Sequence, residues 1–108
     1  MQPGIYNITI PQGTDQTLPF TIAGYDLTLY TAKLQARTNY GASTAFVTLT
    51  NGSGITLGNG TFSIAFTNAQ TNAMPLGQWV YDLEITSGAG VVDRLIQGSF
   101  TVTPQVTV

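Results

Sequence analysis

The chain has 108 residues, with five acidic and three basic side chains and neither histidine nor cysteine. The missing histidine excludes acid–base triads and His-ligated zinc, and the missing cysteine excludes disulfides, thiol nucleophiles and iron–sulfur clusters. The formal net charge of −2 and a single lysine argue against nucleic acid and anionic membranes as partners. Hydrophobic residues make up 43% of the chain, enough for a core, but charged residues only 7%, so neutral polar side chains must cover the surface.

No apolar run approaches the ~18 residues that a membrane-spanning helix needs. The first residues, Met1 to Gly4, lack the basic and apolar regions of a secretion signal, so we expect synthesis in the cytoplasm.

Apolar and polar residues alternate through most of the chain, and this period of two predicts β-strands. In chain order the predicted strands are residues 5–10, 17–22, 30–37, 45–50, 55–57, 61–67, 78–86 and 96–103. Glycine-rich turns separate several of them, as in Asn51-Gly52-Ser53-Gly54. Residues 91–95 do not keep one phase of alternation, which predicts a bulge or register change there.

One segment departs from this pattern. The residues from Asn68 to Met74 tolerate a helix, follow a possible cap at Thr67 or Asn68 and precede Pro75, so we predict one helical turn. Seven to eight short strands in this length predict a single immunoglobulin-like antiparallel β-sandwich over residues 1–108. The ends, Met1 to Ile10 and Phe100 to Val108, are expected to be extended arms that could exchange strands with neighbouring subunits.

Charged residues on the predicted strands are the first candidates for function. Asp82 and Glu84 lie two positions apart on one strand face, where paired carboxylates could bind a cation or flank a glycosidic bond. Cross-strand pairing with Lys33 and Arg37 is the favoured alternative. Arg94 could be an interface anchor or an ordinary surface residue. The candidate interface is therefore Lys33, Arg37, Asp82, Glu84 and Arg94.

The remaining polar and aromatic candidates have simpler interpretations. Asp15 and Asp26 fall in loop-like segments, where an aspartate side chain commonly caps a turn. Trp79 shares the phase of the apolar strand residues, which favours the core over sugar binding. Exposed tyrosines at Tyr6, Tyr25 or Tyr40 could stack on sugar rings. No catalytic residue, metal ligand or cofactor is predicted.

Three stretches in order resemble a known family, the small β-sandwich domains of tailed-bacteriophage virion proteins. They are Gln12 to Thr17; Tyr30 to Arg37, which is similar to a "YTAxxQxR" strand; and a set comprising Gln70-Thr71, Leu76-Gly77, Tyr81 to Thr86, Arg94 to Gly98 and Val106-Thr107. In the first stretch, Thr14 and Asp15 are arranged differently from the family's Gly-Asp-Thr-type turn.

The resemblance implies a non-catalytic accessory subunit of a virion that is made in the host cytoplasm. Capsid decoration (cement) and head–tail or neck attachment are the first expectations, and a baseplate or tail-fibre docking module is the alternative. The implied partners are other virion proteins, either the major capsid protein or tail and neck proteins, together with further copies of the chain. A carbohydrate-binding or adhesin module is the competing class. An enzyme built on Asp82 and Glu84 is a distant third.

Overall fold

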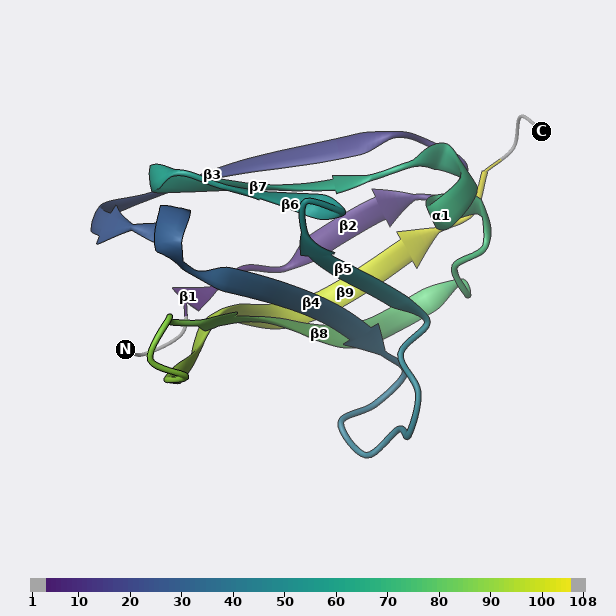
Figure 1. Ribbon diagram of the computed structural model, residues 1–108. Helices are drawn as coiled ribbons and strands as arrows, with labels where there is room; N and C mark the ends of the chain where they lie inside the picture. Colours follow the sequence, from purple (N-terminus) through teal and green to yellow (C-terminus); the bar gives the residue numbers. More distant parts are fainter. Residues whose placement is uncertain (1–3, 106–108) are drawn as a thin grey trace.

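A computed structural model describes residues 4–105 of the chain (Figure 1). Nine strands, one short α-helix and one 3-10 turn make up its regular structure. In chain order these are β1 (Gly4–Ile5), β2 (Ile8–Pro11), β3 (Gln16–Asp26), the 3-10 turn η1 (Leu27–Leu29), β4 (Thr31–Arg37), β5 (Val47–Asn51), β6 (Gly54–Leu57), β7 (Asn59–Phe66), α1 (Asn68–Asn72), β8 (Gly77–Thr86) and β9 (Val92–Thr103).

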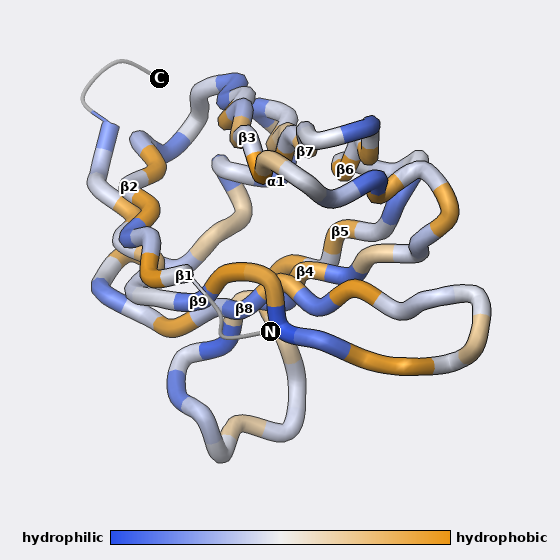
Figure 2. Tube along the Cα trace, turned by 90° about the vertical axis from the view of Figure 1, so that its left-hand side faces the viewer, coloured by the Kyte–Doolittle hydropathy of each residue, from blue (hydrophilic) through white to orange (hydrophobic). Residues whose placement is uncertain are grey.

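All nine strands belong to one hydrogen-bonded sheet that curls over on itself. The order along the sheet is β1-β9-β8-β4-β5-β6-β7-β3, and β2 pairs with β9 beyond the end of β1. The chain passes from one half of the sheet to the other at a short parallel contact, where Thr50 lies opposite Gly54. Figure 2 shows the result as two facing layers, with β3 and β7 in one and β4, β8 and β9 in the other.

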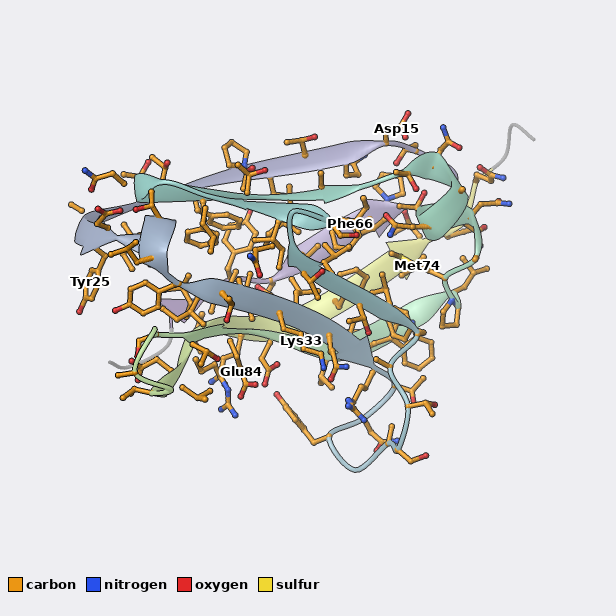
Figure 3. The ribbon with its side chains drawn as sticks, viewed as in Figure 1. Asp15, Tyr25, Lys33, Phe66, Met74 and Glu84 are labelled. Carbon is orange, nitrogen blue, oxygen red and sulfur yellow. The ribbon has the colours of Figure 1, made fainter. Side chains whose placement is uncertain are left out.

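The side chains between these layers form one apolar core. Alternate positions of β4 and β8 point inward, so that Leu34 and Leu83 face each other across the strand pair and are fully buried. Phe100 of β9 lies at the centre of a ring cluster whose edge-to-face contacts have centroid separations of 5.7 to 6.0 Å. Its three ring partners are Phe46, Phe66 and Tyr81. Figure 3 shows Phe66 between the layers and Met74 beside α1.

The all-β prediction is confirmed, and the predicted strands all appear with shifted boundaries. The sheet path is continuous through the β5–β6 contact, so hydrogen bonding does not divide the strands into two separate sheets. The immunoglobulin-like arrangement stays a prediction. Nine strands replace the expected seven to eight because the segment predicted as residues 5–10 is interrupted between Ile5 and Ile8.

The interruption between β1 and β2 has a local cause. The carbonyl of Tyr6 accepts a hydrogen bond from the Tyr81 hydroxyl, with an O–O distance of 2.5 Å. The Asn7 side-chain oxygen, not a backbone carbonyl, accepts from the Ser99 amide at 3.1 Å. A Cβ added to Gly98 would lie 2.5 Å from the Tyr6 carbonyl oxygen, so glycine is required for the backbone to approach this closely.

Burial, and secondarily the nearby Tyr6 phenol, raises the pKa of Tyr81 above the ordinary value near 10. At alkaline pH the folded protein therefore keeps this phenol protonated, whereas the same phenol in the unfolded chain releases its proton. The contribution of this phenol to the free energy of unfolding is complete below pH ~10. At higher pH the free energy of unfolding falls by up to about 1.4 kcal/mol per pH unit.

Tyr81→Phe should lower the free energy of unfolding by about 1 kcal/mol at neutral pH, because the hydrogen bond to Tyr6 is lost. The variant should also lack the decrease in stability at alkaline pH that the Tyr81 phenol causes. Urea unfolding of both proteins at about pH 8 and pH 11 measures the difference, and equal alkaline losses would contradict it.

The helical turn and the bulge both appear where they were predicted. Thr67 is the N-cap of α1, and Thr67 and Gln70 form a reciprocal capping box. The bulge lies at Leu95, because Leu83 pairs with Ile96 while Glu84 pairs with Arg94. Leu95 and Ile96 both contribute to the core as a result.

The predicted arms are partly described. At the amino-terminal end β1 and β2 are paired parallel to β9 of the same chain, and Ile8 and Ile10 are buried in the core. At the carboxyl-terminal end β9 extends to Thr103. The rest of the predicted arms, residues 1–3 and 106–108, lies outside the described residues, as does the Val106-Thr107 element of the resemblance.

Candidate functional site: a charged sheet face

The outer face of β4, β8 and β9 carries charged side chains in register. Glu84 of β8 lies directly opposite Lys33 of β4 on one side and Arg94 of β9 on the other. In the next row Asp82 lies between Gln35 and Gln97. Figure 3 shows Lys33 and Glu84 on the same outer side of this layer. The face so formed, consisting of Lys33, Arg37, Asp82, Glu84 and Arg94, is called the charged face below.

An ion pair joins two strands of this face. The Arg94 Nε atom lies 3.2 Å from Asp82 Oδ2, and both side chains are partly exposed, at 46% and 35%. The same guanidinium donates from Nη1 to the Gln97 side-chain oxygen at 3.1 Å. The bulge at Leu95 makes this arrangement possible: strict alternation would send Arg94 to the same side as the buried Ile96.

The second arginine fixes a loop beside the face. Arg37 donates from Nη2 to the Gln35 side-chain oxygen at 2.8 Å and from Nη1 to the Ala42 carbonyl at 2.6 Å. These bonds connect the end of β4 to the loop that leads to β5 and contains Tyr40, whose side chain is 78% exposed. A groove of about 210 Å³ lies between this loop and the sheet. Its lining includes Gln35, Arg37, Tyr40, Val80, Asp82 and Arg94.

The distribution of charge over the chain is strongly uneven. All three basic residues and two of the five acids lie on the charged face, so its formal charge is +1. The other three acids, Asp15, Asp26 and Asp93, bring the whole chain to −2. A cationic face on an otherwise acidic chain can orient an approaching anionic surface.

The structure therefore places all five candidate interface residues on one face, although not with the pairing expected. Lys33 does lie opposite Glu84, but Arg37 lies opposite Val80, and the partner of Asp82 is Arg94. Sequence reasoning did not connect Tyr40 with these charges and did not single out Gln35 or Gln97. No sequence signal places the loop of Tyr40 over this face, because the position of the loop depends on the strand register and on the hydrogen bond from Arg37 to the Ala42 carbonyl.

The other candidates lie elsewhere. Asp26 accepts hydrogen bonds from the hydroxyl of Thr28 at 2.6 Å and from its amide at 3.0 Å, which confirms the capping role and lowers the pKa of Asp26. Asp15 instead binds the start of α1, accepting from the Asn68 amide at 2.7 Å. Trp79 packs against the core, as predicted, and its indole donates to the Pro75 carbonyl at 2.8 Å.

The three tyrosines considered for sugar stacking do not all lie on one surface. Tyr6 packs edge-on against Phe20 with ring centroids 4.9 Å apart. Tyr25 lines a different, apolar cleft together with Ile96. Tyr40 alone among the three lines the groove on the charged face.

Two further observations concern residues 4–105. Within them no group of three or more acidic side chains is arranged to hold a metal ion. No helix in the same part of the chain is long and apolar enough to cross a membrane.

No family model matches the chain, and no curated protein matches it.

Proposed function

We propose that the chain is a non-catalytic structural subunit that docks on the particle of a tailed bacteriophage, as a capsid decoration protein or a head–tail or neck attachment protein. The docking surface is the charged face. The particle is proposed from the sequence resemblance described above, and the surface from the geometry. A baseplate or tail-fibre position is the alternative location.

One observation supports docking in particular: a chain with eight charged residues places five of them on one sheet face. Fold stability does not require this concentration, because exposed ion pairs contribute only about 0 to 1 kcal/mol each. Arginine, by contrast, is enriched at the energetic centres of protein interfaces. Both arginines of the face are held in fixed orientations by neighbouring side chains, which lowers the entropy lost on binding.

Mass spectrometry of purified particles tests the proposed role. The experiment uses the phage that encodes the chain, with heads and tails separated and copies counted in each fraction. Many copies that follow the heads are expected for decoration, and a few copies that follow the necks for attachment. A few copies that follow the tails would move the protein to the baseplate or fibre alternative. Absence from the particles would contradict the virion role altogether.

Glycan binding is a second candidate, and Tyr40 is the observation that favours it. An exposed aromatic ring beside carboxylate, amide and guanidinium groups offers an apolar surface for a sugar ring and hydrogen-bonding groups for its hydroxyls. Under this alternative, Tyr40→Ala would abolish retention on a glycan array. Under particle docking the unchanged protein would not be retained by any glycan.

A further inference from the structure

We infer that the free protein forms a two-fold dimer through the end of the molecule opposite α1. The residues described carry eight exposed large hydrophobic side chains. Six of them belong to β1 and the residue after it, to the segment from the end of β3 through η1, and to the β8–β9 turn with the start of β9, and Figure 1 shows these segments at this end. These six are called the apolar end below: Ile5, Tyr6, Tyr25, Leu29, Val91 and Val92. The inference goes beyond the particle role and does not depend on it.

The strand register brings these segments together. Thr86 at the end of β8 lies opposite Thr31 on one side and Val92 on the other, so η1 and the β8–β9 turn are neighbours. β1 joins them from the other edge, because Gly4 pairs with Ile96. Figure 2 views this end directly and shows orange, apolar stretches along the tube.

An apolar cleft opens beside these residues where the two ends of the curled sheet approach each other. Its volume is about 460 Å³, and its lining includes Phe20, Ile22, Tyr25, Phe62, Leu95 and Ile96. Phe20 and Phe62 are stacked with centroids 4.7 Å apart. A cleft of this size has room for a large aliphatic side chain, and Leu29, which is 82% exposed, supplies one at the same end of a second copy.

The exposed area agrees with a two-copy contact. A contact that covers the exposed fractions of all six residues completely would bury roughly 600 Å² per copy, hence about 1,200 Å² for two copies, which reaches the lower limit for a stable interface. An exposed apolar surface of this size is at the upper limit for monomeric proteins. Because each copy contributes the same end to the interface, the contact closes into a dimer with two-fold symmetry and does not extend into a filament.

Electrostatic repulsion between the two copies opposes this contact only weakly. Two acids lie at this end, Asp26 and Asp93, which directly follows Val92; the Asp26 carboxylate is hydrogen-bonded to Thr28, and Asp93 is not without a partner either. A net charge of only −2 gives weak long-range repulsion between copies.

Sedimentation velocity across a range from low to high micromolar concentration tests the dimer. The unchanged protein should shift from monomer to dimer as concentration rises. Leu29→Asp should remain a monomer throughout, since a carboxylate cannot enter an apolar cleft without a large desolvation cost. The matched control is Leu76→Asp, which adds the same charge at a leucine that is 50% exposed near α1, at the other end. The control should dimerise like the unchanged protein.

Because Leu29 is exposed, its replacement should leave the thermal unfolding temperature nearly unchanged, which separates lost association from lost folding. A monomeric unchanged protein at all concentrations would overturn the inference. A dimer that survives Leu29→Asp, or one that Leu76→Asp disrupts equally, would do the same.

Discussion

Replacing both arginines of the charged face should remove the chain from its particle. In the double variant Arg37→Gln and Arg94→Gln, the face loses its only two guanidinium groups, and the Asp82 carboxylate loses its ion-pair partner. Each arginine at the centre of an interface contributes about 2 kcal/mol or more, so occupancy at limiting concentration should fall at least about a hundredfold. Quantitative blotting of particles assembled with the variant measures this loss.

A matched control keeps the net charge equal. Thr17→Glu with Thr61→Glu also changes the formal net charge from −2 to −4, but on exposed positions of β3 and β7, in the opposite layer. This control should be incorporated like the unchanged protein. Normal incorporation of the double arginine variant, or equal loss in the control, would mean that the charged face is not the docking surface.

Truncation of the central core ring should have the largest effect on stability. Phe100 is fully buried and contacts three other rings, so Phe100→Ala leaves a cavity as well as removing apolar contacts. The expected loss is about 3 to 5 kcal/mol, a large part of the ~5 to 15 kcal/mol that typical domains possess. Denaturant unfolding measures it.

The comparison for this experiment is Tyr40→Ala, which also truncates an aromatic ring but at a largely exposed position. Its effect should stay within about 0.5 kcal/mol. Similar losses for Phe100→Ala and Tyr40→Ala would contradict the placement of the core between the two layers.

Sequence alternation predicted the strands well because each half of the curled sheet has one buried face. In β4, for example, Ala32, Leu34 and Ala36 are buried while Lys33 between them is exposed. The path of the sheet could not be predicted in the same way. The turn at Asn51 to Gly54 has the residues of a hairpin, yet the chain changes layers there and makes a parallel contact, which depends on packing between distant segments.

The candidate site was predicted in its residues but not in its geometry. Alternation assigned Lys33, Arg37, Asp82 and Glu84 to polar strand faces, which is where they lie. Their pairing depends on strand order and register, which a single sequence does not contain. Arg94 joins them only because Leu95 is bulged, and the loss of phase in residues 91–95 indicated an irregularity without showing which side the arginine would face.

Site-specific photo-cross-linking on intact particles tests the central claim most directly. A photoreactive side chain at Thr48, which is exposed on β5 beside Gln35 at the edge of the charged face, leaves every proposed docking residue in place. The same side chain at Thr61 reports on the opposite layer. The account predicts cross-links to another virion protein from position 48 and none from position 61. Cross-links from position 61 alone, or equally from both, would contradict docking through the charged face.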